Sequence, residues 1–225
     1  MRRFAHHPLP EVGSEVKLSQ DAAHHYRDVL RGRVGEEVEL FDGHGTSARA
    51  LILAVTADAV HAQIQSRSQQ ATHPEWVIVL SVLKGPAMDT AIRMATEAGA
   101  TRLLPVLSAR SIAKGDRSER WKRIAKTAAQ QCGRASIPAV PPPQSLPDAL
   151  ATLSGHTLYI AHPSVPDTPT PAGNCAVLIG PEGGWTDAEV QLATRHGAHP
   201  LCLGPHVFRA DTAVAVAAAW LAQRR

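Results

Sequence analysis

The pattern of apolar and polar positions changes partway along the chain, and its first part predicts β-structure. In the first seventy residues, short runs alternate between apolar and polar side chains, which is typical of half-buried strands. The runs span residues 15–18, 37–41, 47–55 and 60–65. A compact barrel of about five or six short strands would close such a set without leaving exposed edges.

One helix is expected between the first two of these runs. Ser19 or Asp21 can cap its start, since both side chains accept hydrogen bonds from free backbone amides. Apolar side chains then recur at the spacing of one helix face, at Ala23, Tyr26, Val29 and Leu30.

The second part of the chain alternates strands with helices. A polar stretch at residues 69–74 is interpreted as a linker, so we predict one domain at 1–72 and another at 73–225. Strands are expected at 77–83, 103–107, 157–161, 175–179 and 200–203, and helices at 86–98, 118–132, 187–196 and 212–223. This alternation indicates an α/β fold, with a mostly parallel sheet covered by helices on both faces.

Two Gly-Pro turns follow strands in the last third of the chain. Residues 179–186 connect a strand to a helix that opens with the capping box Thr186-Asp187-Ala188-Glu189. Residues 203–212 connect the next strand to the last helix, with Asp211 or Thr212 as its cap. Ligands of doubly wound sheets bind outside the carboxyl ends of the strands, so the two turns can frame one small-molecule pocket.

The chemistry of the first turn narrows the choice of ligand. The chain has neither a P-loop nor a G-x-G-x-x-G fingerprint. Glu182 in the middle of the turn would repel a phosphate but tolerate a cationic sulfonium or an adenosine. The alternative is a plain tight turn before a well-capped helix, and spacing alone leaves both interpretations open.

The net charge of +3 conceals a local excess of basic residues. Residues 110–134 contain eight lysines and arginines, opposed only by Asp116 and Glu119. Such a run is often a solvated helix face. An imbalance of this size favours a polyanionic partner such as nucleic acid.

Composition and missing motifs argue against several other modes of function. Aromatic residues make up only 4% of the chain, so stacking of RNA bases on aromatic side chains is not expected to be its main mode of recognition. Three cysteines without a CxxC pair favour a reducing compartment. No signal peptide or membrane span is apparent, so we expect a cytoplasmic protein without a membrane partner. The twelve histidines show no metal-binding spacing, and no metal is expected.

Several segments of the chain together resemble those of a known family. In chain order they are Val29-Leu30-Arg31, Leu40-Phe41-Asp42-Gly43, Lys84-Gly85, Glu97-Ala98-Gly99-Ala100, Ser108-Ala109-Arg110-Ser111, Gln131-Cys132-Gly133-Arg134, Leu178-Ile179-Gly180-Pro181-Glu182-Gly183-Gly184, and Leu203-Gly204-Pro205 with Arg209. In their order and spacing these segments closely resemble the RsmE family of 16S ribosomal RNA uridine-N3 methyltransferases, of the SPOUT class. The chain departs from the family at Phe208-Arg209-Ala210-Asp211-Thr212-Ala213, where the family usually has Leu-Arg-Thr-Glu-Thr-Ala.

The resemblance implies a fold, a reaction and partners. The expected fold is a small N-terminal PUA-like β-barrel for RNA, followed by a SPOUT-type parallel-sheet domain with a C-terminal trefoil knot. The expected cofactor is S-adenosylmethionine, and the expected substrate is a uridine in 16S ribosomal RNA of the small ribosomal subunit. A homodimer is also implied.

The site hypothesis follows from the two turns and from the chemistry of methyl transfer. Arg209 is the first candidate for a catalytic residue, because a fixed guanidinium would stabilise the anion that forms when uridine N3 loses its proton. Asp211 is the second candidate, either as proton acceptor or as helix cap. The expected cofactor contacts are Ile179, Gly180, Glu182, Gly183, Gly184, Leu203, Gly204 and Val207. The expected RNA phosphate contacts are Arg31, Arg110, Lys114, Arg117, Arg120 and Arg134.

Three other functions stay open at this point. A relative with the same fold can methylate another RNA, such as transfer RNA, and a non-catalytic RNA-binding protein can keep the pocket as scaffold. A Rossmann-type oxidoreductase comes last, because its glycine fingerprint is missing.

Overall fold

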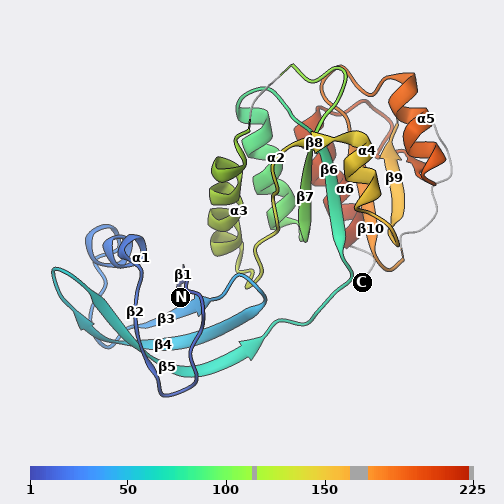
Figure 1. Cartoon of the computed structure of the whole chain (residues 1–225). Helices are drawn as coiled ribbons and strands as arrows, with labels where there is room; N and C mark the ends of the chain where they lie inside the picture. The colour runs from blue at the N-terminus through green and yellow to red at the C-terminus, as the bar shows by residue number, and fades with distance from the viewer. Residues whose placement is uncertain (113–115, 163–171, 223–225) are drawn as a thin grey trace. The chain divides into compact units, whose positions relative to one another are not determined.

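The computed structural model describes residues 1–112, 116–162 and 172–222 (Figure 1). Contacts between residues divide the chain into two units. Unit 1 contains Met1–Thr72 and Ala129–Ile137, and unit 2 contains His73–Ala128 and Pro138–Arg225. The segment Ala129–Ile137 therefore packs with unit 1, although it lies within the second half of the sequence. Lys114 lies outside the described residues.

Unit 1 is built on one five-stranded sheet. Its strands are β1 (Arg2–Ala5), β2 (Glu15–Lys17), β3 (Glu37–Phe41), β4 (Thr46–Val55) and β5 (Val60–Gln69), and their order in the sheet is β1-β3-β4-β5-β2. The β1–β3 pair is parallel and the other pairs are antiparallel. Strand β1 was not predicted, because two of its four residues are arginines and its apolar alternation is too short to recognise.

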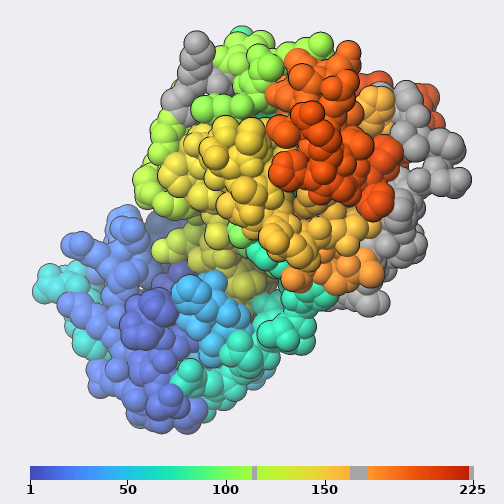
Figure 2. All heavy atoms as spheres, turned by 45° about the vertical axis from the view of Figure 1, so that its right-hand side comes forward, coloured from blue at the N-terminus to red at the C-terminus, as the bar shows by residue number. Residues whose placement is uncertain are grey.

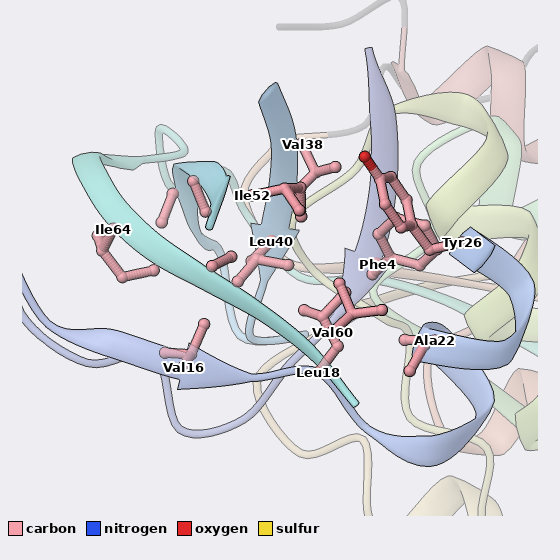
Figure 3. Packing of buried hydrophobic residues seen from close by; sticks show 14 of the residues in the cluster. Phe4, Val16, Leu18, Ala22, Tyr26, Val38, Leu40, Ile52, Val60 and Ile64 are labelled. Carbon is pink, nitrogen blue, oxygen red and sulfur yellow. The ribbon is translucent and has the colours of Figure 1, made fainter. Parts of the chain in front are cut away.

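The core of unit 1 gathers apolar side chains from all five strands and from the helical segment (Figure 3). The expected helix is present and has two parts. It runs from Gln20 to His24 as α1, where the Ser19 side chain accepts a hydrogen bond from the Ala22 amide, and continues as a π-helical turn, His25–Val29. Val29 is 59% exposed, unlike Ala23 and Tyr26, because the wider π-helical turn departs from the spacing of an α-helix.

Unit 2 contains a six-stranded sheet in which every ladder is parallel, as the sequence predicts. Its strands are β6 (Trp76–Ser81), β7 (Arg102–Leu107), β8 (Gln144–Ser145), β9 (Thr157–Ala161), β10 (Cys175–Ile179) and β11 (His199–Leu201). Their order is β11-β9-β10-β6-β7-β8. All residues of β6 and β10 are buried, as expected for continuous apolar strands between two helical layers.

Helices cover both faces of this sheet (Figure 1). They are α2 (Pro86–Glu97), α3 (Ser118–Cys132), α4 (Leu146–Ala151), α5 (Asp187–Arg195) and α6 (Ala210–Ala222). Helices α2 and α6 pack against each other, and α6 contacts β6 and β10. Helices α4 and α5 cover the opposite face, where α4 (yellow) and α5 (orange) form the surface in Figure 2. The carboxyl ends of β9, β10 and β11 therefore open between two helical layers.

Candidate active site

A cavity of about 550 Å³ lies at the carboxyl ends of three neighbouring strands in unit 2. Its walls come from the end of β9, from the turn after β10 and from the loop after β11. The two Gly-Pro turns thus line one cavity, which is the arrangement expected from the sequence. Seven of the eight expected cofactor contacts are in its described lining: Ile179, Gly180, Glu182, Gly184, Leu203, Gly204 and Val207.

The turn after β10 requires glycine at two positions. The Gly184 amide donates a hydrogen bond to the Pro181 carbonyl at 2.8 Å and closes a four-residue turn. Gly184 has a φ of 70°, a left-handed conformation that favours glycine. At Gly180, an added Cβ would lie 3.2 Å from the backbone nitrogen of Trp185. Backbone therefore packs closely against backbone on this side of the cavity.

Helix α5 begins directly after this turn and has the predicted capping box. The Thr186 hydroxyl accepts from the Glu189 amide, and Glu189 Oε2 accepts from the Thr186 amide at 2.8 Å. Glu189 Oε1 also accepts from the Ala109 amide at 2.8 Å. Burial works to raise the pKa of Glu189, but these amides, the Thr186 hydroxyl and nearby Arg110 together hold that pKa below its usual range. The carboxylate therefore joins the start of α5 to the loop after β7.

Arg110 belongs to the same junction. Its Nη1 donates hydrogen bonds to the Gly183 carbonyl at 2.7 Å and to the Trp185 carbonyl at 3.2 Å. Gly183 is the one expected cofactor contact that lies outside the described lining of the cavity. The structure thus places the Arg110 guanidinium on the turn, a contact that the sequence analysis did not foresee.

Of the two expected catalytic residues, Arg209 lies at the end of the loop after β11 and Asp211 lies in the first turn of the last helix, α6. Arg209 lines the cavity and its side chain is 78% exposed. Its Nε donates to Asp211 Oδ1 at 3.3 Å, and the same oxygen accepts from the Thr212 amide at 3.0 Å. The side chain of Asp211 is only 16% exposed, and Asp211 lies outside the described lining.

The expectation that Asp211 or Thr212 caps the last helix is wrong. Helix α6 begins at Ala210, and the Ala213 amide already donates to the Arg209 carbonyl at 2.8 Å. Asp211 and Thr212 therefore lie in the first turn. The predicted start at residue 212 is two residues too late. Alanines such as Ala210 and Ala213 give no periodic apolar signal in an alanine-rich segment.

Other lining residues were missed by the sequence analysis. His162 follows β9, and the position of β9 between β10 and β11 cannot be read from one sequence. His206 and Phe208 belong to the loop after β11. Their position within the Gly-Pro turn at residues 203–212 is the sequence signal that could have identified them. Trp185 is buried beside the cavity, and its Nε1 has no hydrogen-bond partner within the described part of the chain.

The residues expected to contact RNA are in different environments. Arg31 and Arg117 are exposed, and Arg31 has a φ of 49°. Arg120 is exposed too, but it forms an ion pair with Asp89 of α2, with its Nη2 2.6 Å from Asp89 Oδ2. Arg134 is only 8% exposed and donates to Ser136 Oγ at 3.2 Å, so its burial leaves little surface for a phosphate.

The cavity suits a nucleoside-type cofactor. Its volume lies in the range of small-molecule sites, and its wall combines apolar side chains with the backbone of two glycine-containing turns. The exposed carboxylate of Glu182 is suited to an ammonium or sulfonium group and unsuited to a phosphate. S-adenosylmethionine, which has both cationic groups and an adenosine, fits this set of residues.

A metal site and a membrane-spanning helix were also sought among the described residues. Within residues 1–112, 116–162 and 172–222, no group of three or more histidine, cysteine or acidic side chains can hold a metal ion. In the same ranges, every helix is too short or too polar to cross a bilayer.

Comparisons with known families match both parts of the chain. Residues 70–222 match a family described as an RNA methyltransferase domain, and residues 18–65 match an RNA methyltransferase PUA domain. The chain is 31% identical to the ribosomal RNA small subunit methyltransferase E of Mycobacterium bovis, with 93% of this chain and 86% of the relative covered. It is 32% identical to the protein of the same name from Synechocystis, with 94% and 74% covered.

Solved structures agree with these relatives. A ribosomal RNA small subunit methyltransferase E from Neisseria gonorrhoeae bound to S-adenosylmethionine has a TM-score of 0.89 and 30% identity, and 97% of this chain and 95% of that chain are covered. A methyltransferase from Legionella pneumophila with the same bound cofactor has a TM-score of 0.89 and 29% identity, with 97% and 96% covered.

Proposed function

The chain belongs to the ribosomal RNA small subunit methyltransferase E family, and from this premise we propose that it transfers a methyl group from S-adenosylmethionine to N3 of a uridine in 16S ribosomal RNA. It is an RNA methyltransferase that uses S-adenosylmethionine. The choice of N3 and of a small-subunit uridine rests on the resemblance of its segments to the RsmE family.

One observation carries the proposal for the site. Two turns that begin with Gly180 and Gly204, 24 positions apart in the sequence, line one cavity, and Arg209 is part of the same lining. The proposed cofactor contacts are the backbone of Ile179, Gly180, Gly184, Leu203, Gly204 and Val207, and the carboxylate of Glu182.

The reaction requires alignment and a nucleophile. When bound, S-adenosylmethionine supplies a methyl group that its positive sulfonium already activates. Uridine N3 is a weak nucleophile until its proton leaves, and the resulting charge spreads to the ring carbonyl oxygens. The guanidinium of Arg209 stabilises that charge, because a preorganised cation acts on charge that develops in the transition state.

Asp211 has a positioning role in this proposal. Its Oδ1 already accepts hydrogen bonds from Arg209 Nε and from the Thr212 amide, and its side chain is mostly buried. Asp211 thus holds Arg209 towards the acceptor base. The N3 proton passes to solvent, since the Arg209 side of the cavity is exposed.

RNA recognition is proposed for the exposed arginines and for the PUA domain of unit 1. Arg31 and Arg117 are exposed, and Arg120 can exchange Asp89 for a phosphate at its exposed ion pair. Lys114 belongs to the same proposed set from outside the described residues. Such contacts make RNA affinity fall steeply with salt.

The assembly and the compartment are also proposals. A homodimer is supported by α6, whose apolar Val216 and Trp220 are only partly buried within one chain. Light scattering of the purified protein tests it. Cys132, Cys175 and Cys202 form no disulfide in the described part of the chain, which together with an RNA substrate supports a cytoplasmic location. The trefoil knot implied by the resemblance stays a prediction.

Transfer of tritium from labelled S-adenosylmethionine tests the proposed substrate. Small ribosomal subunits, free 16S ribosomal RNA and transfer RNA are compared, and the labelled nucleoside is identified by digestion and chromatography. We expect label in small-subunit RNA as 3-methyluridine. Label in transfer RNA instead, or cofactor binding without transfer to any RNA, would contradict the proposal and favour one of the two alternative functions.

A further inference from the structure

We propose that Arg110 is a positioning residue that holds the turn after β10 in the shape required for cofactor binding. The inference rests on the proposed use of the cavity for S-adenosylmethionine. It replaces the expectation that Arg110 contacts RNA phosphates, and it concerns the face of the turn that points away from the cofactor.

The hydrogen bonds of Arg110 close the outer side of the turn. Nη1 donates to the carbonyls of Gly183 and Trp185, at 2.7 and 3.2 Å, so one nitrogen bridges two residues of the same turn. Hydrogen bonds from a charged donor are shorter and stronger than those between neutral groups. The residues on either side of Gly183, Glu182 and Gly184, line the cavity, whereas Gly183 lies outside its described lining. The turn therefore presents one side to Arg110 and the other to the cavity.

The stem of the Arg110 side chain lies next to Gly183. A Cβ added to Gly183 would lie 3.4 Å from both Cβ and Cδ of Arg110. The aliphatic part of the arginine thus packs directly on the Gly183 backbone. The sequence predicted that Gly183 contacts the cofactor, whereas in the structure its backbone contacts Arg110.

The loop that carries Arg110 is itself fixed to α5. The hydroxyls of Ser108 and Ser111 lie 2.8 Å apart, and the Ser111 amide donates to the Ser108 carbonyl at 3.1 Å. The neighbouring Ala109 amide donates to Glu189 Oε1. Ala109 therefore binds the start of α5, and the adjacent Arg110 binds the turn after β10.

Charge balance supports this placement. The amino end of a helix carries partial positive charge, and an arginine nearby is unfavourable unless an anion compensates. The Glu189 carboxylate supplies that anion from the first turn of α5. Arg110 and Glu189 thus form parts of one assembly on the β10 side of the cavity, and a phosphate is not needed to balance the arginine.

Two variants of Arg110 separate cofactor positioning from RNA binding. Arg110→Ala removes both hydrogen bonds, and Arg110→Lys keeps the charge but loses the planar guanidinium. Arg123→Ala, at an exposed position on α3, is the matched control for loss of one surface arginine. Calorimetry with S-adenosylmethionine gives the cofactor Kd, and filter binding of 16S ribosomal RNA at several salt concentrations gives RNA affinity and its salt slope.

We expect Arg110→Ala to raise the cofactor Kd about tenfold, the lower end of the effect of hydrogen bonds to a charged group. The KM for S-adenosylmethionine should rise equally, whereas kcat at saturating cofactor should change less than about twofold, as when binding alone is lost. Arg110→Lys should lie between wild type and Arg110→Ala. Arg123→Ala should leave the cofactor Kd unchanged.

The opposite pattern would overturn the inference. If Arg110→Ala leaves the cofactor Kd unchanged, and RNA affinity and the salt slope fall instead, Arg110 is a phosphate contact. If kcat falls while KM stays constant, Arg110 does not act through cofactor binding. A wild-type protein that takes up no S-adenosylmethionine would refute the proposed use of the cavity itself, before any variant is considered.

Discussion

The two sides of the cavity are built in different ways. On the β10 side, a Cβ added to Gly180 would lie 3.2 Å from the Trp185 backbone nitrogen, and a capping box fixes Thr186. Arg110 binds the turn from outside, and Ala109 binds Glu189 of α5. On the β11 side, the loop is exposed. Val207 is 83% exposed, and Arg209 is held by one hydrogen bond to Asp211 in the described part of the chain.

This difference corresponds to the two ligands that the enzyme has to bind. The β10 side is preorganised, which lowers the entropic cost of binding a small cofactor. The β11 side exposes Arg209, the cation that we propose acts on the acceptor base. In the proposed function, the cofactor contacts the backbone of both turns, and the exposed Arg209 on the β11 side remains available to the acceptor base.

The largest effect is expected on the β11 side. Arg209→Ala should lower kcat at least about 100-fold, the scale of losing one preorganised donor to a developing anion. The cofactor Kd should stay within about twofold, because the β10 side is intact. Single-turnover kinetics with small subunits, together with calorimetry, measure both quantities. Activity close to wild type would show that Arg209 is wrongly assigned.

A matched pair of glycine variants tests the difference in rigidity. In Gly180→Ala the new Cβ meets the backbone nitrogen of Trp185 at 3.2 Å, and this backbone is fixed by the capping box. We expect a loss of about 1–3 kcal/mol in unfolding free energy, typical of overpacking. In Gly204→Ala the Cβ meets the Phe208 ring at 3.0 Å, but that side chain lies in an exposed loop and can move.

Gly204→Ala should therefore cost less than Gly180→Ala, even though its closest contact is shorter. Chemical denaturation of both variants measures the difference, and the cofactor Kd of Gly180→Ala should rise with its loss of stability. Equal or reversed costs would contradict the idea that the β10 side is the rigid one.

Much of the fold could be predicted from the sequence. The features that could not be predicted depend on contacts between residues far apart in the chain. The strand at Cys175–Ile179 and the capping box at Thr186 are local, and both are confirmed. The sheet order is not local: β9 lies between β10 and β11, and it brings His162 to the cavity. The function of Arg110 was also hidden, because its partners Gly183 and Trp185 are more than seventy residues away.

Asp211→Asn tests whether the β11 side contains a general base. Asp211 holds Arg209 through one hydrogen bond at 3.3 Å to a largely exposed guanidinium, and such exposed pairs contribute about 0.2–1 kcal/mol. We therefore expect kcat to fall less than about fivefold, with an unchanged pH–rate profile. A general base would instead lose a factor of about 100 or more and its acid limb in the pH–rate profile.

The smallest expected effect is the pH dependence that Glu189 gives to the β10 side. Its pKa in the folded protein lies below the ordinary value of 4.5, because the Thr186 and Ala109 amides, the Thr186 hydroxyl and Arg110 outweigh the opposing effect of burial. A carboxyl with a lowered folded pKa stabilises the fold above its unfolded pKa, and this contribution is lost as pH falls through the folded value.

The unfolding free energy of wild type should thus exceed that of Glu189→Gln by a constant amount above about pH 5, and the gap should close as the solution becomes more acidic. Because the carboxylate is partly exposed, we expect the gap to be less than about 1 kcal/mol. Glu182→Gln, which changes an exposed carboxylate of the same turn, is the matched control and should show a smaller gap. Urea unfolding between about pH 3 and pH 7 measures these differences across the titration range of carboxylates. A gap that widens towards acid would mean that burial raises the pKa of Glu189, and the junction between the turn, α5 and Arg110 would then not be held by an ionised carboxylate.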